Sequence, residues 1–243
     1  MNRQVPWARV FVEGVVIIAS ILLAFGIDAW WARRSTEVEA RAELTRIHAE
    51  LVLDRERIAT RVRTQELVAA AALKFAELLD TTGQATVAVP DTLARRLLRA
   101  GTYETQTPAL DGLMSSGRIS LIQDVGVRSA IATWERAVRN ASEQQLRTRW
   151  VADEYLLPAL SDRGDIAHVV RSEASGLPYR SELLASADLE VDPIASTRVT
   201  ADGPLKTAVS LRFSSAARAF FALDGVLQST DALVAAIEAT RAR

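Results

Sequence analysis

The chain has 243 residues, a formal net charge of −1 and no cysteine; 49% of its residues are hydrophobic and 24% are charged. The near-neutral charge argues against a nucleic-acid-binding protein, which normally carries a strong basic excess. The absence of cysteine excludes disulfides and thiol chemistry. The length is sufficient for one membrane segment and one domain of about 200 residues.

The most informative segment is the apolar run Val10–Trp31, which follows a short tail, residues 1–9. As a helix it is about 33 Å long, against roughly 30 Å of bilayer hydrocarbon. Aromatic and basic residues that favour the membrane interface flank it: Trp7, Trp30, Trp31, Arg33 and Arg34. We therefore predict a single transmembrane helix, with the bilayer as a partner. One alternative is a signal peptide cleaved near Gly26, although Glu13 would interrupt its apolar region. The other is a buried helix in the core of a soluble domain.

A long helix is expected over 33–79, because apolar residues recur there at three- and four-residue steps without Gly or Pro. This stripe widens at Leu67–Leu73, which suggests burial on more than one face. Charged residues on the other side, Arg55, Arg57 and Arg61 among them, are expected to be solvated. The apolar positions are Val38, Ala42, Leu44, Ile47, Leu51, Ile58 and Val62.

Residues 80–90 are expected to form a loop, and two short helices should follow, over Leu93–Ala100 and from Pro108 to the break at Gly117. A second long helix is predicted over 124–158, capped by Asp124, and a third over 205–242. In the second, Val127, Ile131, Trp134, Val138, Leu146 and Trp150 should be buried. Residues 161–203 are irregular, and no strand is expected. The sequence thus predicts an all-α fold, with a helical bundle domain over 32–243 in which the long helices pack antiparallel.

Two short stretches resemble a widespread family of uncharacterised single-pass bacterial membrane proteins. The first comprises Glu13, the run Ile21–Ala24 and Trp30, and is similar to the family's amino-terminal G-E-I-x-L-V-x-x-G-I-L-I-A-L-x-x-N-x-W motif. The second comprises Leu113, Ser116, Gly117, Leu121, Ile122, Arg128 and Trp134. The chain departs from the pattern at Ser20, Asp28, Asp124 and Val12. The resemblance implies a bacterial inner-membrane protein with a helical domain, and it implies no activity.

Two features of the sequence give opposite predictions for the orientation of the chain in the membrane. Arg3 and Arg9 precede the apolar run, whereas Arg33, Arg34, Arg41 and Arg46 follow it, so the count of basic residues slightly favours a cytoplasmic domain. Acidic residues offset that carboxyl-terminal flank, and long carboxyl-terminal domains often cross regardless of charge. We therefore expect the amino end inside and the domain outside, in the periplasm.

Glu13 and Asp28 bracket the apolar run and are about 22 Å apart along a helix, on roughly the same side. Ser20 and Ala24 lie between them on that face as a small-xxx-small pair, which permits close helix approach. The functional hypothesis is self-association through this face, or an ion path that uses the two acids. The simpler alternative places each carboxylate, partly hydrated, at an interface.

The segment Leu113–Ile122, with Leu113, Ser116, Gly117 and the downstream Arg128, is interpreted as a structural turn rather than a site. His48 and His168 have no credible serine or metal partners, and no phosphate-binding glycine loop occurs. The expectation is therefore no enzyme, no cofactor and no metal.

The leading hypothesis for function is a membrane-anchored interaction or scaffold protein that self-associates and meets an unknown protein partner. A sensor-like ligand-binding bundle with a pocket under residues 161–203, and a small ion-coupled subunit, are the alternatives.

Overall fold

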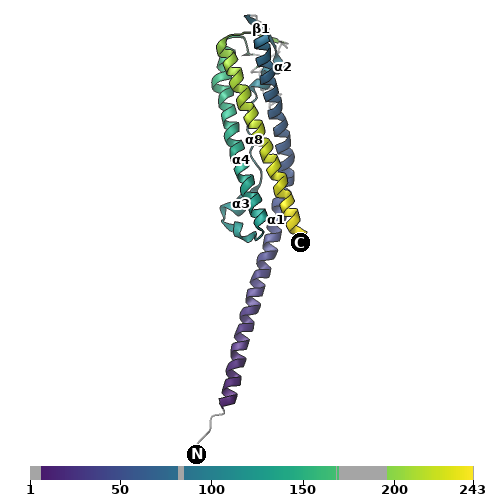
Figure 1. The fold of residues 1–243 in the computed structure, drawn as a ribbon, viewed down its shortest axis with the longest axis vertical. Helices are drawn as coiled ribbons and strands as arrows, with labels where there is room; N and C mark the ends of the chain where they lie inside the picture. The colour runs from purple at the N-terminus through teal and green to yellow at the C-terminus, as the bar shows by residue number, and fades with distance from the viewer. Residues whose placement is uncertain (1–6, 82–84, 168, 170–195, 243) are drawn as a thin grey trace, which may run out of the picture.

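A computed structural model of the chain describes residues 7–81, 85–167, 169 and 196–242 (Figure 1); within this part, the side chains of residues 7–10, 12–14 and 81 are left undescribed. The fold is all-α, as predicted, apart from one small two-stranded sheet. The helices and strands are α1 (Trp7–Thr81), β1 (Thr86–Pro90), α2 (Asp91–Leu98), α3 (Pro108–Ser115), the 3-10 helix η1 (Arg118–Leu121), α4 (Val125–Val151), the π-helix η2 (Ala152–Leu156), α5 (Leu157–Ser161), β2 (Ser196–Thr200) and α8 (Gly203–Arg241).

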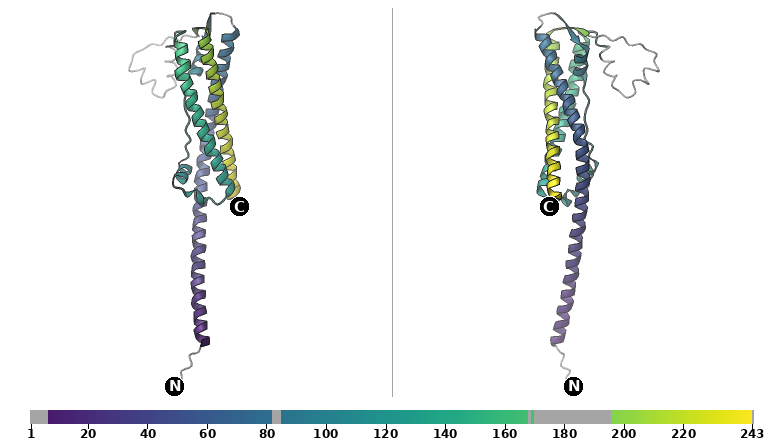
Figure 2. Two further views of the ribbon diagram at one scale, coloured as in Figure 1. Left: turned by 60° about the vertical axis from the view of Figure 1, so that its left-hand side comes forward. Right: turned by 90° about the vertical axis from the view of Figure 1, so that its right-hand side faces the viewer.

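The bundle is built around α8, which packs along both α1 and α4. Helices α1 and α4 run away from the amino-terminal end, and α8 returns antiparallel to both, so that the chain ends beside α1 (Figures 1 and 2). Between α2 and α3 the chain descends as the non-helical segment 99–107. This segment occupies the place that a fourth helix would take in an up-down-up-down bundle.

The core is a line of three apolar clusters along α8. One cluster surrounds Phe75 at the end far from the amino terminus, a small central one surrounds Ile58, and the third surrounds Trp134. In the predicted stripe of α1, Leu44, Ile47, Leu51 and Ile58 are buried, as expected for a helix that covers a core with one face. Helix α1 is thus a wall of the bundle rather than its centre.

Several residues expected in the core are instead exposed. Val38, Ala42, Leu67 and Leu73 lie on the outer side of α1, so that helix is buried on only one face. In α4, Val127, Ile131 and Trp134 are buried, but Leu146 and Trp150 are exposed. The reason is that α4 and α1 each pack mainly on α8, and in the described part of the chain no helix covers their outer sides.

The turn that joins α3 to α4 is formed as the sequence predicts. Gly117 has φ +69°, in the left-handed region that glycine adopts without strain. The Asp124 side chain accepts hydrogen bonds from the amides of Gly126 and Val127, at 2.8 and 3.2 Å, and so caps α4.

The expected loop over 80–90 is wrong in its second half, which forms strand β1. This strand pairs antiparallel with β2, with Val87 opposite Val199 and Val89 opposite Thr197, and every second residue of each strand is buried. Each strand is five residues long and its partner lies more than one hundred residues away in the sequence, so neither gave a recognisable signal alone. The helix expected from Leu93 begins two residues earlier, at Asp91, whose carboxylate accepts a hydrogen bond from Thr197.

The second long helix also extends beyond its expected end at Pro158. It passes through the π-helical turn Ala152–Leu156 into α5, which ends at Ser161. Pro158 follows the N–H of Leu157, which bonds the Ala152 carbonyl in the π-helical turn. Because proline has no N–H, Pro158 cannot continue this series of bonds, and the helix ends three residues later.

Two neighbouring leucines of α1 test the one-sided burial of this helix. Leu51 is fully buried, whereas Leu53 is 68% exposed. We expect Leu51→Ala to lower the free energy of unfolding by about 2–5 kcal/mol, because it leaves a cavity in the core. Leu53→Ala should change it by less than about 0.5 kcal/mol. Urea unfolding of the full chain in detergent, followed by circular dichroism, measures both; similar losses would contradict the assigned faces.

Candidate functional site

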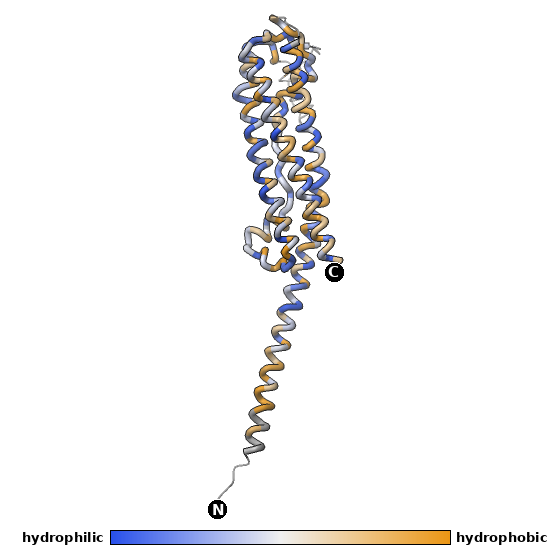
Figure 3. Tube along the Cα trace, viewed as in Figure 1, coloured by the Kyte–Doolittle hydropathy of each residue, from blue (hydrophilic) through white to orange (hydrophobic). Residues whose placement is uncertain are grey.

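The apolar amino-terminal part of α1 extends from the bundle and contacts no other described part of the chain. Every described side chain from Val15 to Ser35 is exposed, and hydrophobic residues cover this part of the helix (Figure 3). Two helices, α1 and α8, are long and apolar enough to cross a membrane. Helix α8 lines the core of the bundle, whereas the apolar stretch of α1 is not buried at all.

The predicted membrane-face residues remain separate from the bundle. Ser20 donates a hydrogen bond to the Val16 carbonyl at 2.8 Å, within its own helix. Ala24 and Asp28 are exposed along the same side. The side chains of Glu13 and Trp7 lie outside the described residues.

The residues expected at the interface follow the apolar stretch. The rings of Trp30 and Trp31 are 6.3 Å apart, and Arg33 and Arg34 are exposed one turn further on.

The second motif closes the turn between α3 and α4. Leu113 is buried in the cluster around Trp134, and the Ser116 hydroxyl donates to the Gly112 carbonyl at 2.7 Å. Arg128 donates to the Ile122 carbonyl at 3.0 Å, which ties the first turn of α4 to the end of η1. Together with Gly117, these side chains serve local structure.

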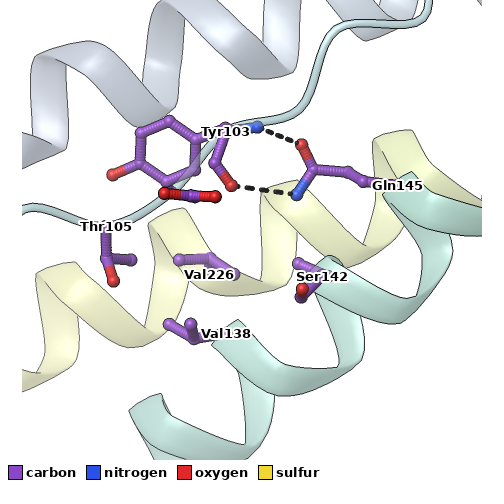
Figure 4. Close-up of a pocket in the computed structure, with 8 residues that line it drawn as sticks. Tyr103, Thr105, Val138, Ser142, Gln145 and Val226 are labelled. Atoms are coloured by element: carbon purple, nitrogen blue, oxygen red, sulfur yellow. Dashed lines mark hydrogen bonds between the residues drawn. The ribbon is translucent and has the colours of Figure 1, made fainter.

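The segment 99–107 takes its hydrogen bonds from side chains of the flanking helices. Gln145 of α4 accepts from the Tyr103 amide at 2.7 Å and donates to the Tyr103 carbonyl at 3.4 Å (Figure 4). The Tyr103 hydroxyl donates a short hydrogen bond to the buried carboxylate of Asp54 on α1. Burial and this hydrogen bond raise the pKa of Tyr103. A cavity of about 140 Å³ lies beside Tyr103, between the segment, α4 and α8.

A row of polar residues on α1 faces this segment and the start of α3. The Glu50 carboxylate accepts from the Ala109 amide at 2.9 Å, at the positive amino end of α3. Arg57 donates a short hydrogen bond to the Gln106 side chain. Arg61 lies against Gly101. Arg57 is exposed, as expected for a solvated face, whereas Arg61 is only partly exposed, because an extended chain rather than a helix fills this side of the bundle.

Arg212 of α8 is fully buried and joins three elements. Its guanidinium donates to the Leu97 carbonyl at 2.8 Å, to the Thr148 carbonyl at 3.0 Å, and by a short hydrogen bond to the Arg99 carbonyl. It also donates to the Thr148 hydroxyl at 2.6 Å. Burial lowers the pKa of Arg212 to about 10, so the side chain remains a cation at neutral pH. A buried cation thus fixes the start of the extended segment through neutral acceptors.

A second site rich in arginine lies on the α1 side of the segment 99–107, at the turn formed by Ala100 and Gly101. A cavity of about 300 Å³ is lined by Arg61, Thr64, Gln65, Val68, Arg99, Ala100 and Gly101. Arg149 of α4 approaches the turn as well, and its guanidinium donates to the Ala100 carbonyl at 3.4 Å. Burial, and then the charges of Arg99 and Arg149, lower the pKa of Arg61. We call this cavity and its lining the arginine pocket.

The sequence analysis missed the arginine pocket and Arg212. One signal was available for Arg212, which falls on the buried stripe of α8 between Val209 and Ala216. A charged residue at a core position normally has buried hydrogen-bond partners. No comparable signal marked Arg61, because its neighbours come from segments distant in the sequence.

Within the described residues, no group of three or more His, Asp or Glu side chains has the arrangement of a metal site. His48 pairs instead with Glu238 of α8, at 2.9 Å. His168 and most of the irregular segment under which a sensor pocket was expected lie outside the described residues.

Comparisons of this chain with family models, with curated proteins and with solved structures find no match.

The hydrogen bond between Tyr103 and Asp54 has a measurable consequence for stability. We expect Tyr103→Phe to lower the free energy of unfolding by about 1–3 kcal/mol, because it removes the donor to a buried carboxylate. The exposed Tyr155 packs edge-on against Trp150 and serves as a matched control, since Tyr155→Phe removes a solvent-facing hydroxyl. Equal effects of the two substitutions in urea unfolding would show that the Asp54 contact does not stabilise the fold.

We expect substitution of Arg212 to lower the free energy of unfolding more than Tyr103→Phe does. Arg212→Leu removes the guanidinium that donates to the Leu97, Arg99 and Thr148 carbonyls and should lower the free energy of unfolding by about 3 kcal/mol or more. Arg212→Lys keeps the charge but has one donor group for three elements, so it should fall between the Leu variant and wild type. Arg218→Leu, at an exposed position of the same helix, is the control. Losses of the same size at 212 and 218 would refute the assigned role.

Proposed function

We propose that this protein is a non-enzymatic scaffold of the bacterial inner membrane, anchored by α1 and self-associating as parallel copies. The helical domain would stand in the periplasm and present its sides to a protein partner. The proposal rests on one observation: one face of α1 is covered by no described residue. This face continues from the apolar stretch into the bundle.

This face, the outer stripe, repeats at three- and four-residue steps along α1. Below the bundle and along its lower half, its members are all exposed. In the bundle region they lie opposite the buried residues Leu44, Ile47 and Leu51. The outer stripe comprises Ser20, Ala24, Asp28, Trp31, Ser35, Val38, Ala42, Thr45, Ala49 and Val52.

The composition and register of the outer stripe favour a second copy as its occupant. Copies anchored in one membrane with one orientation lie parallel and at the same height, so the stripe of each copy meets the same stripe of the other. In lipid, small residues such as Ser20 and Ala24 permit close approach of helices. In water, association would bury Val38 and Val52, which are 58% and 43% exposed. A sustained seven-residue repeat also predicts a left-handed supercoil.

Helix α1 is a suitable element to connect the membrane with the domain. It continues without interruption from Trp7 to Thr81, about 110 Å at 1.5 Å per residue. The sequence has neither Gly nor Pro between Gly26 and Gly83 to kink it. A change in helix packing within the bilayer would therefore reach the bundle directly.

Cysteine cross-linking in native membranes tests the arrangement, because the chain has no cysteine of its own. We expect Ala49→Cys, on the outer stripe, to form a covalent dimer on mild oxidation. Ala132→Cys, an exposed alanine of α4, is the matched control and should give at least about fivefold less dimer. Adding Ala24→Leu to the Ala49→Cys chain should reduce the dimer yield, since it widens the predicted contact in the membrane. Equal cross-linking at positions 49 and 132, or no effect of Ala24→Leu, would contradict parallel packing through α1.

A further inference from the structure

We propose that the arginine pocket binds a small soluble anion, through a carboxylate or phosphate group held by Arg61 with Arg99 and Arg149. This inference goes beyond the proposed self-association and does not depend on it, because the pocket and the outer stripe use different sides of α1.

Cationic side chains gather around the pocket. Three guanidinium groups from three segments approach the turn at Ala100 and Gly101: Arg61 from α1, Arg99 from the end of α2, and Arg149 from α4. The described residues that line the cavity include no aspartate or glutamate. The charges of Arg99 and Arg149 disfavour the charged form of Arg61, and a bound oxyanion beside Arg61 would oppose this effect. The guanidinium fork also matches the geometry of carboxylate and phosphate.

Arg61 has an unused donor. Its Nε is buried, and no acceptor among the described residues bonds to it. A buried polar nitrogen without a partner is costly, because it has lost its water and gained nothing in exchange. Most side chains in such a position find an acceptor within the protein. A ligand oxygen in the adjacent cavity would supply one.

Gly101 keeps the cavity wall close to Arg61. A Cβ added at this position would lie 3.1 Å from Nη2 and 3.2 Å from Nη1 of Arg61. A Cβ at this position therefore requires the guanidinium to shift by a few tenths of an ångström. On the other side of the turn, Arg212 fixes the Arg99 carbonyl and Arg149 contacts the Ala100 carbonyl. The pocket thus has a fixed backbone wall, with Thr64 and Gln65 as further hydrogen-bonding groups.

The volume of the pocket and its distance from Trp31 along α1 limit the class of ligand. A cavity of about 300 Å³ fits a small molecule and excludes a nucleic acid. Arg61 lies thirty residues beyond Trp31 on one continuous helix, about 45 Å along its axis. If Trp31 marks the membrane surface, the lipid headgroups of that membrane do not reach the site. The ligand class is therefore a soluble carboxylate or phosphate compound.

Titration of the full chain in detergent tests the site, with inorganic phosphate and succinate as separate probes and sodium chloride at matched ionic strength as the baseline. We expect at least one probe to raise the melting temperature and to bind in calorimetry. Arg61→Gln should weaken that binding at least tenfold. Arg63→Gln removes an exposed arginine two residues away on α1, and it should leave affinity within about twofold of wild type. A response to phosphate alone or to succinate alone identifies the preferred oxyanion.

The ligand-free variants separate a binding role from a structural one. Since Arg61 is repelled by its neighbours and its Nε is unpaired, Arg61→Gln should raise the melting temperature of the ligand-free chain. A residue that holds the fold together would lower it. Gly101→Ala gives a second route, because it should weaken binding while leaving every arginine in place. The proposal is overturned if neither probe binds beyond the chloride baseline, or if Arg61→Gln binds as wild type does.

Discussion

The fold depends on how the extended segment 99–107 satisfies its backbone hydrogen bonds. A chain that replaces a helix in a bundle has no internal partners for its amides and carbonyls, and burial without partners would cost several kcal/mol. Here the side chains of the flanking helices supply those partners. Arg212 bonds the carbonyls of Leu97 and Arg99, and Gln145 bonds both the amide and the carbonyl of Tyr103. Three of the buried polar residues, Asp54, Gln145 and Arg212, thus contact this extended segment.

The same constraint explains the arrangement of the long helices. An extended segment is narrower than a helix, so α1 and α4 lie on either side of it and both pack against α8. Helix α8 consequently carries the most buried residues and also the buried arginine. At the far end, β1 and β2 pair next to α2 and connect the residues before the extended segment to those before α8. The short helices and the sheet thus fix the two ends of the extended segment, which the long helices contact only along its length.

The molecule divides into two regions with different chemistry. The amino-terminal part of α1 is apolar, and its described side chains from Val15 to Ser35, like those of the outer stripe, are exposed, which supports the proposed anchoring and self-association. Far above them, Arg61, Arg99 and Arg149 approach the turn at Gly101. A single uninterrupted helix carries both, since Trp31, Ala49 and Arg61 all belong to α1. The apolar stretch and the pocket are therefore connected by one continuous helix.

The sequence by itself determined the helices, because their signals are local. Three- and four-residue periodicity located α1, α4 and α8, Asp124 and Gly117 marked a cap and a turn, and the apolar run with its tryptophans indicated a membrane helix. Only the tertiary structure decided which faces are covered, so Leu146 and Trp150 are exposed while Arg212 is buried. It alone paired β1 with β2 and brought Arg61, Arg99 and Arg149 to one turn. Those contacts join residues that are far apart in the chain. Long-range packing selects such partners, and a local sequence pattern does not identify them.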